Sequence, residues 1–563
     1  MDYRKAYQAW LEDEFIDEES KKELRALDGN DEEIKDRFYT SLQFGTAGLR
    51  GKLGAGTNRM NIYTVAQASE GFARFISKQG DKAKKMGVSI GYDVRHFSKE
   101  FAELSAEIFA GHGIHVYLHR DICPTPLLSY TVRETGSFAG VMITASHNPK
   151  EYNGYKAYNS YGSQILDDWA NAIEKEIGGI ESYSSVNKIG LEEALDEGLV
   201  EYVKNDLIEN YIRDILKLTI NEDVDYSVNI VYSPLNGCGN KLVRRIFKER
   251  GFNNVHIVKE QENPDPDFTT VGYPNPEDPK AFAYSERLGK EVGADLLFAT
   301  DPDSDRCALE VKDSNGSYEF FDGNRVGALL GYYILSQLEE KGKLPKNGAV
   351  IKSIVTGDLL VAIAKDYGIE AFEVLTGFKN IAEYPNKWDK SGEYQYVYGF
   401  EESIGYNPST FVRDKDAVSS AMLIAEMAGY YKSKGKSLID VYKEICEKYG
   451  YYNNRLVSVV LEGIAGKERI DRIMKEFRSN PIKEVGELRL SKFIDYKNDD
   501  TGLAKSNVLR YFYDDGSWYA IRPSGTEPKI KIYMYSVGKT LEESHKKLEA
   551  FEKATNNMME QVQ

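Results

Sequence analysis

The chain has few cysteines, no long apolar run and no excess of positive charge. Its cysteines are Cys123, Cys238, Cys307 and Cys446, scattered through 563 residues without CxxC spacing. That distribution excludes a disulfide-stapled scaffold and fits core thiols in a reducing compartment. No uninterrupted apolar stretch approaches the roughly 18 residues of a membrane helix, so we expect no association with a membrane.

Negative charge outweighs positive charge, with 89 Asp and Glu residues against 72 Lys and Arg residues and a net charge of −17. Nucleic acid is therefore not expected as a partner, because phosphate backbones are bound by basic surfaces. The first residues, from Met1 to Ala6, lead into a charged helical pattern instead of an apolar secretory core. We therefore expect a cytoplasmic protein.

The length predicts several domains, since about 150 residues per domain is a reasonable prior. Strand-like apolar runs alternate with helical periodicity over the first four fifths of the chain, which is typical of βαβ units. From about Tyr452 the strands become longer and alternating. We expect an α/β protein with four domains around a central cleft, three βαβ-rich mixed-sheet domains and a smaller C-terminal α+β domain. The predicted boundaries are 1–205, 206–316, 317–451 and 452–563.

Individual elements follow from the same patterns. Strands are expected at 88–92, 114–118, 138–143, 228–232, 255–258, 295–300, 350–354, 371–374, 396–398, 456–461 and 529–535. Helices are expected at 62–78, 98–111, 468–477 and 541–553, and a long loop at 178–190. No internal repeat is clear enough to align by eye.

The run Thr144-Ala145-Ser146-His147-Asn148-Pro149 follows one of these strands. Open α/β sheets place their ligands at the carboxyl ends of strands, which is where this serine lies. A serine hydroxyl is a poor nucleophile and needs a base, a metal or prior loading with a phosphoryl group. Lys156, ten positions on and after a predicted turn, is a candidate general base and acid.

The acidic run Asp301-Pro302-Asp303-Ser304-Asp305-Arg306 follows the strand predicted at 295–300. Its alternating carboxylates can converge on a hard cation, for which Mg²⁺ is the expected ion. A calcium-binding EF-hand loop is excluded, because its sixth and twelfth positions would be Arg306 and Lys312 instead of Gly and Glu. Serine, lysine and three aspartates together indicate phosphoryl transfer.

Two glycine-containing turns have different interpretations. The turn with Gly237 and Gly239 follows a strand, but Leu242 replaces the third glycine of a dinucleotide fingerprint, so we interpret it as structural. The run from Arg522 to Glu527 combines guanidinium donors, hydroxyls and a glycine, which suits binding of a phosphate dianion.

Four strings carry a family resemblance: TASHNPKEYNGYK, DPDSDR, GFEESIGY and RPSGTEPKIKIY. In order and spacing they resemble the α-D-phosphohexomutases, the superfamily of phosphoglucomutases and phosphomannomutases. The resemblance extends from about Phe44 to about Tyr535. The length, the early string FGTAGLRGKLGAGTNRMN and the FEESIGY variant look most like the branch with bacterial α-phosphoglucomutases and eukaryotic phosphopentomutase-type enzymes. Phe400 stands where the family usually has glycine before the Glu-Glu pair.

The resemblance implies roles for the reactive residues. Ser146 would be stored as phosphoserine, and one of its phosphate oxygens would complete a Mg²⁺ site formed by the three aspartates. Lys156 matches the family's lysine after the Asn-Gly pair, and burial with Arg50 or Arg306 nearby would lower its pKa toward neutrality. His147 is an alternative base, or it orients the phosphoserine. The expected catalytic residues are Ser146, Lys156, His147, Arg50 and Arg306, and the expected metal ligands are Ser146, Asp301, Asp303 and Asp305.

The resemblance also implies a substrate site. Glu401 and Ser403 would bind the sugar ring, and a loop further upstream would contact substrate. The string near the C-terminus would bind the phosphate that does not react. The expected substrate-binding residues are Thr376, Gly377, Lys379, Glu401, Ser403, Arg522, Ser524, Gly525 and Thr526.

The expected activity is interconversion of glucose 1-phosphate and glucose 6-phosphate, with glucose 1,6-bisphosphate as intermediate and activator. The last domain would close over the reorienting intermediate. Alternatives are a pentose- or mannose-phosphate mutase, a serine-dependent phosphatase, and a catalytically silent sugar-phosphate sensor. A sugar phosphate is the expected partner, and the chain is expected to be a monomer or homodimer.

Overall fold

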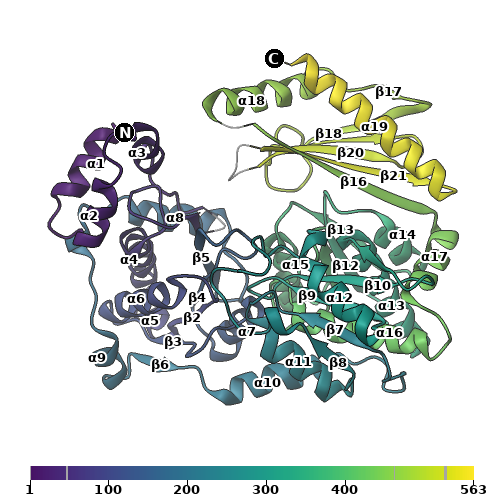
Figure 1. Ribbon diagram of the computed structural model, residues 1–563, viewed down its shortest axis with the longest axis horizontal. Helices are drawn as coiled ribbons and strands as arrows, with labels where there is room; N and C mark the ends of the chain where they lie inside the picture. The colour runs from purple at the N-terminus through teal and green to yellow at the C-terminus, as the bar shows by residue number, and fades with distance from the viewer. Residues whose placement is uncertain (1, 46–47, 462, 525–528, 563) are drawn as a thin grey trace.

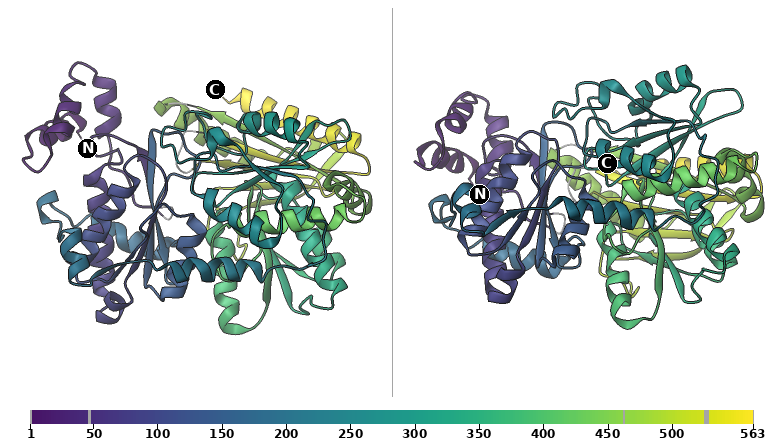
Figure 2. Two further views of the ribbon diagram at one scale, coloured as in Figure 1. Left: turned by 60° about the horizontal axis from the view of Figure 1, so that its bottom comes forward. Right: turned by 90° about the horizontal axis from the view of Figure 1, so that it is seen from below.

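A computed structural model describes residues 2–45, 48–461, 463–524 and 529–562. Four sheets are distributed along the chain, with the first at the left of Figure 1 and the last at the upper right. Figure 2 shows from two further sides that the N-terminal helices lie at one end of the molecule. The predicted α/β fold class is confirmed. Across the described ranges, no helix is both long and apolar enough to cross a membrane.

The first sheet has the order β1-β5-β4-β2-β3-β6, in which β2 pairs in parallel with β3 and β4 while β5 runs antiparallel to β4. All residues of β2 and β4 are buried, which explains why these strands read as continuous apolar runs. The elements up to the end of this region are α1 Tyr3–Glu12, α2 Glu18–Arg25, α3 Asp31–Phe38, β1 Leu49–Lys52, α4 Ile62–Lys78, α5 Asp81–Met86, β2 Val88–Tyr92, α6 Ser98–Gly111, β3 Val116–Leu118, α7 Thr125–Thr135, β4 Ala139–Ile143, β5 Tyr152–Asn159, α8 Asp167–Ile177, α9 Leu191–Asp196, β6 Val200–Tyr202 and α10 Asn205–Leu216.

The second and third sheets have the orders β11-β10-β9-β7-β8 and β13-β12-β14-β15. The second comprises β7 Ile230–Ser233, α11 Gly239–Arg250, β8 Val255–Ile257, α12 Ala283–Val292, β9 Leu296–Thr300, β10 Cys307–Lys312 and β11 Tyr318–Phe321. The third comprises α13 Gly323–Glu340, β12 Gly348–Ser353, α14 Leu359–Asp366, β13 Glu370–Val374, α15 Phe378–Ser391, β14 Gln395–Glu401, β15 Gly405–Asn407, α16 Ala417–Lys432 and α17 Leu438–Tyr449.

One strand arrangement recurs in these three sheets, as β5-β4-β2-β3, β10-β9-β7-β8 and β15-β14-β12-β13. In each sheet a parallel strand, β4, β9 or β14, leads through a short loop into an antiparallel strand. The three loops contain Ser146, the aspartates and Ser403 respectively. The sequence did not show this repeat, because what recurs is the order in which the strands pair and not a string of residues.

The fourth sheet is antiparallel and docks on the third. At the contact, Lys352 Nζ lies 2.7 Å from Glu373 Oε1, to which Arg510 Nη1 also approaches at 2.9 Å. The Tyr535 hydroxyl donates to the Val355 carbonyl at 2.7 Å. The elements are β16 Tyr451–Val460, α18 Gly463–Ser479, β17 Glu484–Val485, β18 Leu488–Asp495, β19 Leu509–Tyr513, β20 Trp518–Pro523, β21 Lys529–Gly538 and α19 Leu541–Gln561.

The predicted helices at 62–78 and 98–111 and the strand at 88–92 are confirmed to the residue. The turn predicted before Lys156 is wrong, because Asn153 and Gly154 belong to β5, which pairs on both sides. A Cβ on Gly154 would lie 2.6 Å from the Thr144 carbonyl oxygen, so glycine permits close strand packing here.

Candidate active site

A cavity of about 900 Å³ lies between all four sheets. Many of the residues predicted from the sequence line it, although they come from distant parts of the chain. They are Arg50, His147, Arg306, Thr376, Gly377, Glu401, Ser403, Arg522 and Ser524. Ser146 and Asp305 are the sequence neighbours of two of them and are buried beside the cavity, with exposed fractions of 4% and 2%.

The loop that carries Ser146 is held in an unusual conformation. Ser146 has φ 52°, and the corresponding loops of the second and third sheets contain Ser304 at 51° and Ile404 at 52°. Left-handed backbone is uncommon outside glycine and collects at functional sites. Buried Arg95 donates to the Ser146 carbonyl at 2.6 Å and to the Pro149 carbonyl at 2.9 Å. Sequence reasoning missed Arg95, although it follows the end of β2, next to β4.

The serine and the acidic loop meet directly. The Ser146 hydroxyl donates to Asp301 Oδ2 at 2.7 Å. One carboxylate oxygen from each of Asp301, Asp303 and Asp305 lies within 4.8 Å of the others, and all three residues are buried. Burial, together with Asp303 and Asp305, raises the pKa of Asp301. Burial opposes the charged form of Asp303 too, but Lys156, together with hydrogen bonds to Asp301 and Thr125, outweighs burial and lowers the pKa of Asp303.

The aspartates have the oxygen chemistry of a hard-cation site. Asp303 Oδ1 and Asp305 Oδ1 are buried and have no hydrogen-bond partner within the described part of the chain. Asp305 Oδ1 has only the distant Arg306 Nε, at 3.8 Å, as a charged neighbour. Buried polar atoms are normally hydrogen-bonded, so these two carboxylate oxygens can take a further partner of positive charge. The residues present therefore fit a divalent cation.

The expected lowering of the Lys156 pKa is wrong. Lys156 Nζ lies 2.7 Å from Asp303 Oδ2 and 3.4 Å from Asp305 Oδ2. Burial favours the neutral amine, but the two carboxylates outweigh it, and the pKa of Lys156 is raised. The two carboxylates therefore keep Lys156 protonated in this arrangement.

His147 and Arg306 lie on either side of the serine–aspartate contact. His147 Nδ1 is 3.3 Å from Ser146 Oγ, and burial followed by Arg306 and Arg50 lowers the pKa of His147 well below its usual range. The imidazole is therefore neutral. The Arg306 side chain faces Glu277 at 3.5 Å, and its backbone N–H donates to Asp301 Oδ1 at 3.1 Å. Arg50 Nη1 donates to Asn148 Oδ1 at 3.5 Å.

The third loop lines the cavity with polar side chains. Glu401 Oε1 accepts the backbone N–H of Gly377 at 2.7 Å, which joins the predicted sugar-binding loop to the upstream loop predicted to contact substrate. Phe400 is buried, and a Cβ on Gly327 would approach its ring to 2.2 Å. The bulky residue is thus accommodated by a glycine on α13, away from the cavity.

The fourth sheet supplies the cationic wall. Arg522 and Ser524 line the cavity together with Lys529 and Lys531. Burial, followed by Lys529, lowers the pKa of Lys531. Gly525 and Thr526, also predicted here, lie outside the described residues.

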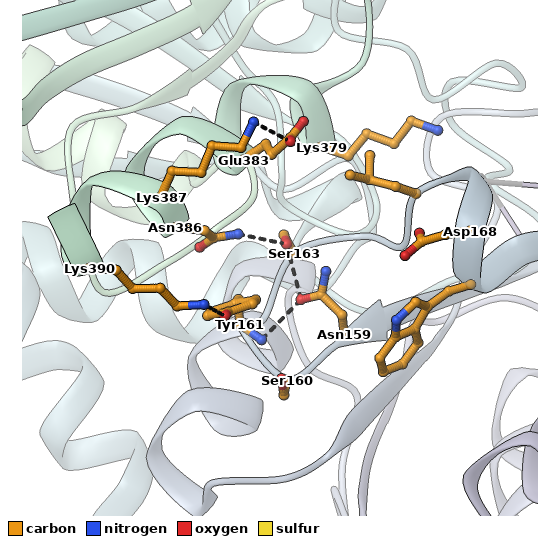
Figure 3. Close-up of a pocket in the computed structure, with 12 residues that line it drawn as sticks. Asn159, Ser160, Tyr161, Ser163, Asp168, Lys379, Glu383, Asn386, Lys387 and Lys390 are labelled. Carbon is orange, nitrogen blue, oxygen red and sulfur yellow. Dashed lines mark hydrogen bonds and ion pairs between the residues drawn. The ribbon is translucent and has the colours of Figure 1, made fainter. Parts of the chain in front are cut away.

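Lys379 is placed away from this group. It lines a separate groove of about 280 Å³ between α15 and the segment after β5 (Figure 3). In this groove Lys387 Nζ lies 2.6 Å from Glu383 Oε1, an ion pair drawn as a dashed line in Figure 3. Burial lowers the pKa of Lys379.

Sequence reasoning also missed Lys415 in the charged run Arg413-Asp414-Lys415-Asp416. Lys415 Nζ lies 3.1 Å from Asp305 Oδ2 and 3.0 Å from Asp414 Oδ1. Burial opposes its charge, but these carboxylates raise its pKa. Four charged residues before the apolar helix α16 were the available signal, because such a run is unusual at a buried helix start.

Models of one known protein family match four consecutive segments of the chain between residues 41 and 544. Models of the phosphoglucomutase/phosphomannomutase family match in order: alpha/beta/alpha domain I at residues 41–184, domain II at 209–316, domain III at 322–449 and the C-terminal domain at 456–544.

Individual proteins are similar over most of their length. A phosphoglucomutase of Staphylococcus aureus (strain MRSA252) is 36% identical over 519 residues, covering 90% of this chain and 91% of that protein. The structure of parafusin (phosphoglucomutase) from Paramecium, in an open form, gives a TM-score of 0.70 at 18% identity, covering 92% of this chain and 96% of the other. A phosphoglucomutase/phosphomannomutase family protein from Burkholderia thailandensis gives 0.67 at 17%, covering 92% and 97%. The two structures share the fold.

Proposed function

The chain belongs to the phosphoglucomutase/phosphomannomutase family and is a phosphosugar mutase, and from this premise we propose that it interconverts glucose 1-phosphate and glucose 6-phosphate through phosphorylated Ser146. The 2.7 Å contact between Ser146 Oγ and Asp301 Oδ2, beside a cavity shared by all four sheets, carries this proposal. This contact places Ser146, the proposed carrier of the phosphoryl group, next to the aspartates proposed to bind a cation.

In the forward half-reaction, the P–O bond to Ser146 Oγ breaks and a P–O bond to the free sugar hydroxyl forms. The proton that the sugar hydroxyl loses and the proton that the serine oxygen gains would be carried by Lys156 and His147, and His147 Nδ1 lies 3.3 Å from Ser146 Oγ. The product is glucose 1,6-bisphosphate. After it turns round, its other phosphoryl group returns to Ser146 by the reverse steps, which restores both proton carriers.

Charge is balanced by groups of the chain around the reacting oxygen atoms. Asp301, Asp303 and Asp305, with an oxygen of the Ser146 phosphate, would hold Mg²⁺, which supplies neutralisation of the charge that develops during transfer. Arg50 and Arg306 add fixed positive charge on the cavity wall.

The remaining residues would recognise the part of the substrate that does not react. Glu401 and Ser403 would bind sugar hydroxyls, with Thr376 and Gly377 beside them. Arg522 and Ser524, with Gly525 and Thr526, would bind the other phosphate, and Lys379 would join them when the fourth sheet and α15 approach the substrate. We further propose a cytoplasmic monomer or homodimer that closes over the intermediate.

A coupled assay of glucose 6-phosphate formation, primed with glucose 1,6-bisphosphate, tests the proposal. Ser146→Ala should abolish activity, whereas Ser184→Ala, at an exposed serine of the same region, should not. If the rate with mannose 1-phosphate or ribose 1-phosphate were higher than with glucose 1-phosphate, that sugar phosphate would be the substrate instead. Stoichiometric phosphate release without isomer would indicate a phosphatase, and binding without turnover would indicate a sensor.

A further inference from the structure

Arg95 is a buried arginine shortly after the end of β2, the strand next to β4 in the first sheet, with an exposed fraction of 3%. Its guanidinium group donates hydrogen bonds to four backbone carbonyls of one short segment. The acceptors are the carbonyls of Ser146 at 2.6 Å, Asn148, Pro149 at 2.9 Å and Tyr152 at 3.0 Å. The proposed transfer gives Arg95 no role, although it binds the segment that carries the reactive serine.

The guanidinium group is also fixed on its other sides. Arg95 Nε lies 3.3 Å from Asp93 Oδ2, and both side chains are fully buried. Asp93 is itself held, because its Oδ1 accepts from the Ser98 hydroxyl at 2.7 Å and from the Arg95 backbone N–H at 2.9 Å. Arg95 lies over the ring of Phe268, 5.1 Å from its centroid, and Phe268 belongs to the segment between β8 and α12. Arg95 therefore contacts both the serine segment and the region of the second sheet.

The carbonyl contacts restrict the direction in which the Ser146 side chain points. Ser146 has φ 52°, a left-handed conformation that is uncommon outside glycine. While its carbonyl accepts from Arg95, its hydroxyl donates to Asp301 Oδ2 at 2.7 Å. The Ser146 N–H donates to Thr144 Oγ1 at 2.8 Å, a bond within the loop itself. Arg95, in contrast, ties the loop to the end of β2 and so places it relative to the sheet.

We propose that Arg95 is a positioning residue for phosphoryl transfer, which keeps Ser146 Oγ next to the aspartates without touching the substrate. This inference rests on the proposed function, because it takes Ser146 as the carrier of the phosphoryl group. Arg95 lies outside the set of described residues that line the cavity. A displacement of about 1 Å at a reacting atom can slow a reaction by about a hundredfold. Loss of Arg95 should therefore lower kcat and leave KM unchanged.

Two substitutions of Arg95 separate its charge from its geometry. Arg95→Met removes every donor, whereas Arg95→Lys keeps the positive charge but has one nitrogen in place of the planar fork that serves four carbonyls. In the primed coupled assay, kcat should fall by about a hundredfold in Arg95→Met and by less in Arg95→Lys, with the KM for glucose 1-phosphate unchanged in both. The rate at which glucose 1,6-bisphosphate phosphorylates Ser146, followed by rapid quenching and mass spectrometry, should fall in parallel with kcat.

Arg250 provides the matched control. It is also buried, pairs with Glu426 at 3.1 Å, donates to the Asn221 carbonyl and lies over the ring of Tyr226, 5.4 Å from its centroid. These partners all lie away from the Ser146 loop. Arg250→Lys and Arg250→Met should therefore lower the urea midpoint of unfolding but keep the wild-type kcat and KM, which shows that loss of a buried arginine does not by itself produce the expected change.

Phe268→Leu is a further variant and decides the question if neither Arg95 variant folds. It removes the ring beside the guanidinium group but keeps the four carbonyl bonds, so kcat should fall by roughly two- to fivefold, the rate equivalent of a cation–π contact. Unchanged kcat in the folded variants, a rise in KM instead, or an equal fall in Arg250→Lys overturns the inference and leaves the proposed function intact. A wild-type protein that glucose 1,6-bisphosphate does not phosphorylate at Ser146 overturns the proposed function as well.

Discussion

The two ends of the cleft are built differently. At the reactive end, Ser146, Asp303 and Lys156 are buried and joined by contacts of 2.7 Å to neighbours in the first two sheets. At the recognition end, Arg522 and Lys531 are half-buried and face the open cavity. A side chain that is held in place before the substrate binds lowers the barrier of the chemical step. A side chain that becomes ordered only when the ligand binds contributes mainly to binding. Substitutions should therefore lower kcat at the first end and raise KM at the second.

The largest effect is expected at Asp303. Asp303→Asn removes a proposed cation ligand and the main partner of Lys156, so kcat should fall by about a thousandfold, equivalent to several kcal/mol of transition-state stabilisation. Steady-state kinetics at saturating glucose 1-phosphate measure this. Asp267→Asn, at a half-exposed surface aspartate, is the control. If Asp303→Asn changed KM alone, the proposed difference between the reactive end and the recognition end would be wrong.

Lys156 should follow, with a fall in kcat of about a hundredfold or more in Lys156→Met, the usual contribution of proton transfer by a side chain. Lys156→Arg distinguishes proton transfer from charge, because arginine keeps the positive charge but does not give up its proton. Pre-steady-state measurement of phosphoryl transfer should show both variants equally slow. Recovery in the arginine variant would assign Lys156 an electrostatic role only.

Arg522→Met sharpens the comparison from the other side. The loss of a charge-assisted contact to the phosphate that does not react should raise KM by about 10- to 100-fold with little change in kcat. Initial rates over a range of glucose 1-phosphate concentrations separate the two constants. Arg287→Met, on the outer surface, should leave both unchanged. A fall in kcat as large as that of Asp303→Asn would contradict the division.

The smallest expected effect is on stability, and it arises at the contact between the third and fourth sheets. Glu373 joins Lys352 and Arg510 between the third and fourth sheets, and although burial opposes its charge, those two cations lower its pKa to about 2. Because the pKa of Glu373 is lower in the folded than in the unfolded protein, its ionisation stabilises the fold fully at pH values above the unfolded-state pKa near 4.5. This stabilisation is lost as the pH falls toward 2. Glu373→Gln should lower the urea midpoint equally at pH 7 and pH 5, and by less at pH 4. A penalty that grows on acidification would contradict this sign.

The sequence predicted most of what is local. Apolar runs identified the parallel strands, and polar residues at their ends identified the loops with Ser146 and the aspartates, because both signals lie within short windows. It did not predict that β5 carries Lys156 back into the sheet, since that depends on pairing with two strands. Arg95 and Lys415 were missed for the same reason. Their partners lie far away in the chain, and only folding brings the charges together.

The account depends most on Ser146 as the carrier of the phosphoryl group. Glucose 1,6-bisphosphate labelled in its phosphates should transfer label to Ser146, located by peptide mass spectrometry, and a chase with glucose 1-phosphate should move that label to the sugar. Label at another residue, or release of labelled inorganic phosphate without labelled sugar, would contradict the account.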